Sequence, residues 1–274
     1  RSGRQYDESY DALVLCPGAR PVRPEIPGVE HPRILTLRSL ADMDAIKAEV
    51  DAAKGRAAIV GAGYIGLELA ENFRIRGWEV ELVELTEQIL PLFDAEMVRP
   101  IQQHLAQHGV RFHPGTRASE FRDVGGRVEV MLGDGRSLLA DFVVLAVGVT
   151  PDSRLAREAG LELGKYGGIK VDAYLRTSDP NILAAGDAIE VVHAVTGEPA
   201  QIPLAGPANR QGRIAAENVC GRNSVYVSTK GTAILKVFGM TAGMTGATEK
   251  ALRRKGMPFR KIYLHPAQHA GYYP

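Results

Sequence analysis

The chain has 274 residues, and its 45% hydrophobic and 24% charged composition excludes a disordered polar chain. Thirty-three lysine and arginine residues balance 32 aspartate and glutamate residues, so the net charge of +1 provides no bulk attraction for nucleic acid or for an anionic membrane. The apolar run over 142–149 is far shorter than the roughly 20 residues that span a bilayer, and two cysteines form no disulfide framework, so we expect a cytoplasmic globular protein.

The first predicted elements are a strand over 12–16 and a helix over 39–53. Between them lies a proline-rich stretch, 21–32, whose composition favours an extended crossing between domains and excludes a helix. The helix is predicted because its apolar residues recur at helical spacing: Leu40, Met43, Ile46 and Val50.

A compact β-α-β pattern follows. It comprises a buried strand over 57–60, a glycine-rich turn, a helix over 67–76 and a second strand over 80–84. A helix over 97–108 and a strand over 110–113 come next. A hairpin is predicted over 127–139, because Asp134-Gly135 lies between two strand-like runs. The run over 142–147 has no polar face, so we expect a strand of a parallel sheet buried on both sides.

After Gly148 the pattern of the first strand returns. Pro151 marks a crossing back, strands are predicted over 169–171 and 182–185, and a helix is predicted over 204–220. From Ser224 onward, strands and a helix over 248–254 indicate the start of a further domain. Because a strand, a glycine and a proline occur in turn at both crossings, we predict that one domain is inserted into another.

The strongest motif is Gly61-Ala-Gly63-Tyr-Ile-Gly66, which follows a strand and opens a helix. Glu84 ends the next strand, 18 residues after Gly66, in the arrangement expected of a dinucleotide site. Gly61 allows the tight turn, Gly63 lets a pyrophosphate approach the backbone, and Gly66 lets the helix pack closely. A helix N-terminus favours the phosphate charge. Glu84 accepts hydrogen bonds from ribose hydroxyls and repels a 2′-phosphate, and no arginine follows within 85–88, which favours NADH over NADPH.

Two further positions are candidates for binding a polyol and a flat ring. Gly186-Asp187 follows an apolar strand, which places the carboxylate to accept a hydrogen bond from a polyol; an ordinary helix N-cap is the alternative interpretation. Leu204 and Ala205 open a helix after Ile202-Pro203, where exposed N–H groups would stabilise negative charge on the ring.

Other residues that suggest chemistry have simpler interpretations. His104 and His108 have a metal-compatible spacing on one helix, but no third ligand is evident, and we predict no metal site. Cys16 ends a predicted buried strand, which favours a packing role over a redox role. Cys220 lies at a helix end with no evident partner.

Taken in order, four segments resemble the flavin-dependent pyridine nucleotide–disulfide oxidoreductases: 10–28 (YDALVLCPGARPVRPEIPG), 61–71 (GAGYIGLELAE), 145–151 (LAVGVTP) and 177–187 (TSDPNILAAGD). The resemblance implies FAD and NADH as cofactors, with NADPH as the alternative. It implies an α/β fold of two Rossmann-like three-layer domains, the NAD(P)-binding domain inserted in the FAD-binding domain, and the start of an α+β dimerisation domain. We expect 1–30 and 149–222 to form part of the FAD-binding domain, 31–148 the NAD(P)H-binding domain, and 223–274 the start of the dimerisation domain.

The resemblance also assigns roles to side chains. Gly18 and Gly148 at the two crossings belong to the cofactor site. So does Ile65 beside Tyr64, whose ring would lie over the flavin and move aside for nicotinamide. Glu68 would orient the nicotinamide amide. The alternative for Tyr64 and Glu68 is that both are exposed helix residues.

A narrower likeness joins 202–213 (IPLAGPANRQGR) and 269–274 (HAGYYP) to coenzyme A-disulfide reductases and related persulfide reductases. In those enzymes a tyrosine of the partner subunit reaches the active site, which implies a homodimer and a role for Tyr272 or Tyr273. The likeness implies a small CoA-linked disulfide or persulfide as substrate, with Asn209 and Arg213 as contacts.

The family begins with another glycine motif and a redox cysteine, and neither is in this sequence. We therefore expect the chain to be incomplete at both ends. Two alternatives stay open: an NADH oxidase or peroxidase of the same fold, and a catalytically silent dinucleotide-binding fragment.

Overall fold

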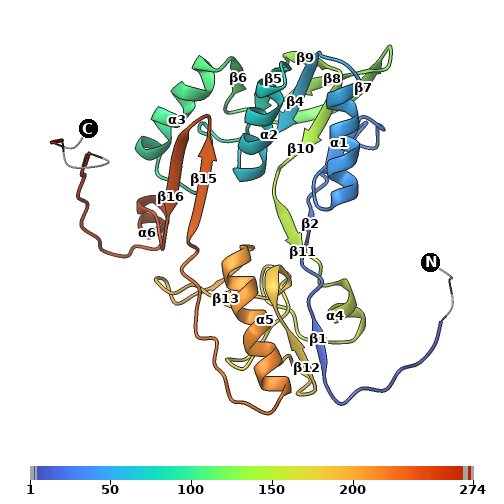
Figure 1. The fold of residues 1–274 in the computed structure, drawn as a ribbon, viewed down its shortest axis with the longest axis vertical. Coiled ribbons are helices and arrows are strands. Elements are labelled where there is room, and N and C mark those ends of the chain that lie inside the picture. Colours follow the sequence, from blue (N-terminus) through green and yellow to red (C-terminus); the bar gives the residue numbers. More distant parts are fainter. Residues whose placement is uncertain (1–2, 4, 268–270, 273–274) are drawn as a thin grey trace.

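The computed structural model describes residues 3, 5–267 and 271–272, and its larger unit, at the top of Figure 1, is built on a five-stranded parallel sheet. The strand order is β3-β10-β4-β5-β6, with the bounds β3 Ile34–Thr36, β10 Phe142–Leu145, β4 Arg56–Val60, β5 Glu79–Val83 and β6 Val110–His113. All four residues of β10 are buried, and β10 pairs in parallel with both β3 and β4, so the prediction of a doubly covered strand is confirmed.

Helices cover one face of this sheet and a small antiparallel sheet covers the other. The helices are α1 Leu40–Ala52, α2 Tyr64–Ile75 and α3 Ala95–Gln107; the antiparallel strands are β7 Ala118–Val124, β8 Arg127–Leu132 and β9 Ser137–Ala140. Phe142 and Val144 pack with the helices, whereas Val143 and Leu145 pack with β7–β9. The alternation along one strand therefore builds a unit of three layers, as predicted.

A second α/β unit is built on two parallel strands, β1 Leu13–Leu15 and β12 Ile182–Ala184. Its other elements are α4 Arg154–Glu158, the 3₁₀ turn η1 Gly186–Ala188, β13 Val191–Val192, β14 Pro199–Ala200 and α5 Ala205–Val219. Ile182, Leu183, Ile214 and Ala215 belong to its core. Among the described residues β1 borders only β12, so Leu13 and Val14 are partly exposed.

The two crossings lie side by side, and they connect the two units. β2 Ala19–Pro21 pairs antiparallel with β11 Val149–Pro151, and the Val22 N–H donates to the Gly148 carbonyl at 2.9 Å. Arg38, at the start of α1, donates to the Pro17 carbonyl at 3.1 Å. β1 continues into β2 and β10 continues into β11, so the carboxyl ends of both parallel sheets point toward this ribbon (Figure 1).

The last described elements pack on the first unit. The hairpin β15 Ala233–Val237 and β16 Met240–Met244 buries Leu235 and Val237 in the core that α2 and α3 share. α6 Glu249–Arg254 follows, and the Asp94 carboxylate accepts hydrogen bonds from the backbone N–H groups of Glu249 and Lys250, at 2.8 and 3.1 Å.

Several details differ from the expectations. Leu40 and Met43 are exposed, because only the later turns of α1, which carry Ile46 and Val50, pack on the sheet. A capping box between Ser39 and Asp42 holds the first turn. α2 begins at Tyr64 rather than 67, since Gly63 is its N-cap. Residues 169–171 form no strand, and Ile169 makes only two isolated bridges, to Leu163 and to Ile189. No helix in the described part of the chain is long and apolar enough to cross a lipid bilayer.

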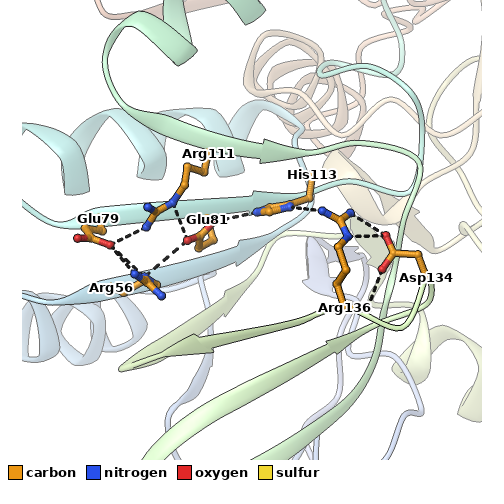
Figure 2. A network of polar contacts seen from close by, with 7 residues as sticks. All are labelled: Arg56, Glu79, Glu81, Arg111, His113, Asp134 and Arg136. Carbon is orange, nitrogen blue, oxygen red and sulfur yellow. Dashed lines mark hydrogen bonds and ion pairs between the residues drawn. The ribbon is translucent and has the colours of Figure 1, made fainter.

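A chain of charged side chains connects the edge of the parallel sheet to the β8–β9 turn (Figure 2). Glu81 on β5 is 4% exposed and bonds His113 at 2.8 Å, Arg111 at 2.7 Å and Arg56 at 3.5 Å. Burial alone would raise the pKa of the Glu81 carboxyl, but the His113 hydrogen bond and the neighbouring positive charges outweigh it and lower the pKa below its usual 4.5.

We predict that this carboxylate stabilises the fold above about pH 4.5 and that its contribution is lost as the pH falls below that value. Because Glu81→Gln removes the charge, the variant should be less stable than wild type by about 2 kcal/mol at pH 7. The difference in unfolding free energy between wild type and variant should decrease as the pH falls from 6 to about 3. Urea unfolding at each pH measures this difference. A difference that stays constant over this range contradicts the prediction.

Candidate functional site

The glycine motif forms a tight loop at the carboxyl end of β4. Gly61 has φ +110°, and its N–H donates to the Val83 carbonyl at 2.8 Å. A Cβ at Gly61 would lie 2.3 Å from the Ala146 oxygen, so only glycine fits between the two strand ends. Gly61 therefore has the turn-forming place that the sequence predicts.

The other two glycines differ in what surrounds them. A Cβ at Gly66 would lie 1.9 Å from the Gly61 oxygen, which shows how closely α2 approaches the loop. A Cβ at Gly63 would meet nothing within 4 Å, so open space lies in front of this backbone. Gly63 is the N-cap of α2 and offers no side-chain cap, which leaves the N-terminal backbone dipoles of α2 directed at that space.

Glu84 lies beside the loop, only 8% exposed. Its Oε2 accepts a hydrogen bond from the Ala62 N–H at 2.8 Å, and its Oε1 accepts one from the Thr86 N–H at 2.9 Å. The Thr86 hydroxyl lies 3.0 Å from Oε1 and 2.9 Å from the Gln88 carbonyl, but its single proton serves only one of them. When Thr86 donates to Gln88, each Glu84 oxygen keeps one lone pair for another donor.

Three predicted residues open α2. Tyr64 packs against Phe93 with ring centroids 6.3 Å apart, and burial raises the pKa of its phenol. Its hydroxyl is buried and has no hydrogen-bond partner among the described residues. Glu68 is exposed on the next turn, and Ile65 is 36% exposed beside the loop. The alternative in which Tyr64 and Glu68 are both exposed therefore fails for Tyr64, whereas Glu68 is exposed.

A second strand edge lies across the ribbon. β1 and β12 are parallel and in register at Leu15 and Ala184, so Gly18 and Gly186-Asp187 follow at the same edge. Asp187 lies within η1 and caps no helix, which excludes the N-cap interpretation. Its carboxyl has no hydrogen-bond or ion-pair partner among the described residues, and partial burial raises its pKa.

The position of this turn depends on a residue that the sequence reasoning missed. Gln211 on α5 is 2% exposed, and its Oε1 accepts a hydrogen bond from the Gly186 N–H at 2.8 Å. The start of α5 is close to the same turn, with Leu204 as an N-cap that supplies no side-chain bond and Ala205 as the first helical residue. A polar residue on the inner face of a helix was the available sequence signal.

The structure does not bring all the predicted residues together. Asn209 and Arg213 are exposed on α5, and the Asn209 amide donates to the Ala205 carbonyl. Tyr272 is 83% exposed, and Tyr273 lies outside the described residues.

His104, His108 and Cys16 have surroundings that sequence alone did not reveal. His104 bonds the Phe238 carbonyl at 2.6 Å and His108 stacks on the Phe238 ring, so both anchor the hairpin. No group of three potential metal ligands occurs in the described part of the chain. Cys16 is exposed rather than packed, and β1 has only β12 as a neighbour among the described residues. Cys220 is exposed as well.

A groove of about 630 Å³ lies between α3 and β6, and Glu87, Gln88 and Pro114 line the end of it that adjoins the Glu84 segment. Val98, Ala106 and Phe112 give it an apolar lining. Because it lies against the outer side of the edge strand β6, it includes none of the residues assigned above.

Known proteins resemble this chain over its whole length. The family described as Pyridine nucleotide-disulphide oxidoreductase matches residues 1–212. The NAD(P)H sulfur oxidoreductase (CoA-dependent) of Pyrococcus furiosus is 35% identical over the entire chain, which spans 62% of that relative. The chain thus spans about six-tenths of the length of this curated relative.

Solved structures also resemble this chain over nearly its whole length. Reduced Bacillus anthracis CoADR-RHD is 44% identical, with a TM-score of 0.94 over 98% of this chain and 48% of that one. The NAD-dependent persulfide reductase from A. fulgidus is 36% identical, with a TM-score of 0.96 over all of this chain and 51% of that one.

One further relative exists in two forms. The water-forming NADH oxidase from Lactobacillus brevis, bound to NADH, is 32% identical and has a TM-score of 0.89 over 93% of this chain and 56% of its own. An engineered NADPH oxidase made from it, bound to NADPH, is 30% identical, with a TM-score of 0.94 over all of this chain and 60% of its own. Its five substitutions replace a glycine, an aspartate 18 residues later, the two residues after the aspartate, and a proline seven residues beyond the aspartate.

The glycine loop gives a matched pair of predictions. Gly61→Ala should lower the free energy of unfolding by about 3 kcal/mol, because the new Cβ meets backbone at a left-handed φ. Gly63→Ala should change it by less than about 1 kcal/mol, since the space is open and the backbone is extended. Urea unfolding of both variants measures this, and equal destabilisation by the two would show that the loop geometry is wrong.

Proposed function

Because the chain belongs to the pyridine nucleotide-disulphide oxidoreductase family, we propose that it passes electrons from NADH through FAD to a CoA-linked disulfide or persulfide. The observation that carries the proposal is the pair of strand edges on either side of the β2–β11 ribbon. One edge carries the glycine loop and Glu84, the other Gly186 and Asp187. Crevices outside the carboxyl ends of parallel strands are where ligands of such sheets bind.

We propose that residues 31–148 bind NADH. The pyrophosphate lies in the open space before Gly63, where the N-terminus of α2 stabilises its charge. The ribose hydroxyls donate to Glu84, and the two free lone pairs match the two donors. Because Tyr64 makes no hydrogen bond through its hydroxyl in the described structure, its ring moves aside for nicotinamide without breaking one. Glu68 then accepts from the amide.

Residues 1–30 and 149–222 fit part of an FAD site. Asp187 is a partly buried carboxylate in need of donors, and the hydroxyls of the ribityl chain supply them. Gln211 fixes the turn, Gly18 and Gly148 flank the ribbon, and the α5 N-terminus at Leu204 and Ala205 favours negative charge. FAD, when bound, accepts the hydride and passes electrons on.

We further propose a homodimer in the cytoplasm, in which residues 223–274 contribute to the interface and Tyr272 or Tyr273 reaches the partner's site. Asn209 and Arg213 on α5 would contact the CoA-linked substrate, since both are exposed on the helix that starts at the proposed flavin edge. NADH is the preferred donor and NADPH the weaker one.

The Lactobacillus brevis pair supports that preference. The spacing of its five substitutions corresponds to Gly66, Glu84, Leu85, Thr86 and Pro91 in this chain. Three of these match in residue type, because Gly66 is a glycine, Glu84 is acidic and Pro91 is a proline. Replacement of the acid accompanies the change from NADH to NADPH in that enzyme. Glu84 would thus exclude a 2′-phosphate by charge repulsion.

The function is tested with the protein expressed from its complete gene. NADH oxidation is followed without oxygen, with CoA disulfide or a CoA persulfide added, and again with oxygen alone. We expect rapid turnover only with the sulfur acceptor. Fast turnover with oxygen alone would identify an oxidase instead, and colourless protein that binds NADH without oxidising it would identify the silent alternative.

Two substitutions test the donor preference. Glu84→Ala combined with Leu85→Arg should weaken NADH binding about tenfold, because acceptors for the ribose are lost, and should strengthen NADPH binding. Isothermal titration with each nucleotide measures both. Glu84→Gln is the control, since it retains an acceptor for the Ala62 N–H. If the NADH and NADPH affinities of the double variant change in the same direction by the same factor, the ribose assignment is refuted.

The open space before Gly63 gives a separate prediction. Gly63→Ala should abolish tight NADH binding, with at least about a tenfold loss, because a methyl group occupies the place proposed for the pyrophosphate. Thermal melting should show an intact fold. Unchanged NADH affinity in this variant would place the pyrophosphate elsewhere.

A further inference from the structure

The segment that carries Glu84 is bonded along its length to the end of β6. The Glu84 N–H donates to the His113 carbonyl at 3.0 Å, and the Thr116 N–H donates to the Glu84 carbonyl at 3.1 Å. The Gly115 N–H donates to the Thr86 carbonyl at 3.0 Å. The stretch 113–116 therefore forms the platform on which 84–86 rests, and any shift of this platform moves the Glu84 backbone.

His113 is the member of this platform whose side chain extends into the charge network around the buried Glu81 (Figure 2). Its Nδ1 lies 3.3 Å from the Arg136 Nη1, and its Nε2 lies 2.8 Å from the Glu81 Oε2. An arginine nitrogen only donates, so Nδ1 accepts and the ring proton is on Nε2, which donates to Glu81. The two contacts thus fix the tautomer and the ring plane together.

On the far side of the network, several charged side chains surround the buried Glu81 carboxylate. Glu81 is 4% exposed and also bonds Arg111 and Arg56, which in turn bond Glu79 at 2.6 and 2.8 Å. Arg136 is held by Asp134 through two contacts of 3.0 and 2.7 Å. His113 is therefore attached at one end to the parallel sheet and at the other to the β8–β9 turn.

We propose that His113 is a positioning residue for the adenosine half of NADH, acting through the platform 113–116 on Glu84. The inference rests on the proposed function, because it takes Glu84 as the ribose acceptor. A loosened platform lets Glu84 leave the Ala62 N–H, and the acceptors for the ribose are then no longer held in place. In this proposal the contacts to the ribose come from Glu84, and His113 acts only through the platform.

The experiment compares three variants of the whole protein by titration with NADH, ADP-ribose and reduced nicotinamide mononucleotide. His113→Leu removes both ring contacts. It should weaken the binding of NADH and of ADP-ribose about three- to tenfold and leave the affinity for the mononucleotide almost unchanged. His113→Gln keeps a donor and an acceptor and should restore most of the affinity. Arg56→Met breaks the same network at its far end and should leave all three affinities unchanged.

The outcomes separate this inference from the proposed function. Wild-type protein that binds neither NADH nor ADP-ribose overturns the function and the inference together. If wild type binds both and His113→Leu binds them equally well, or if Arg56→Met weakens them as much, only the inference fails. If His113→Leu does not fold, Arg136→Leu replaces it, because the exposed Arg136 side chain supplies the donor to His113 Nδ1. An ADP-ribose affinity about twofold weaker in Arg136→Leu supports the proposal, and an unchanged affinity overturns it.

Discussion

The hydrogen bond from the Ala62 N–H to the Glu84 carboxylate organises the whole edge of the parallel sheet. It joins the glycine loop after β4 to the segment after β5 at 2.8 Å, in a place where Glu84 is almost fully buried. A buried carboxylate needs donors, and here backbone N–H groups of two loops supply them. The position of the α2 N-terminus and the acceptors offered to a ribose therefore depend on one side chain.

The β2–β11 ribbon places the carboxyl edge of β1 and β12 opposite this edge. Because β1 leads into β2 and β10 leads into β11, the carboxyl ends of both sheets open toward the same place. Each edge offers a glycine turn, an acidic side chain and a helix N-terminus, which are the features that dinucleotides require. Under the proposed function, a nicotinamide held at one edge would meet a flavin held at the other across this short paired ribbon.

The sequence predicts those parts of the fold that local spacing determines. Helical periodicity located α1, and the glycine motif with its spacing to Glu84 located the loop, because both signals lie within one β-α-β unit. It did not predict the exposure of Leu40, the capping box, or the exposed Cys16, since these depend on which neighbours cover an element. Gln211 and His113 were missed for the same reason: their partners Gly186 and Glu81 are distant in sequence.

The most direct measurement of the central claim is a crystal structure of the protein with NADH bound. The account predicts the pyrophosphate against the Gly63 backbone and at least one ribose hydroxyl within about 3 Å of the Glu84 carboxylate. A dinucleotide bound in the groove between α3 and β6, with Glu84 still bonded only to Ala62 and Thr86, would contradict it.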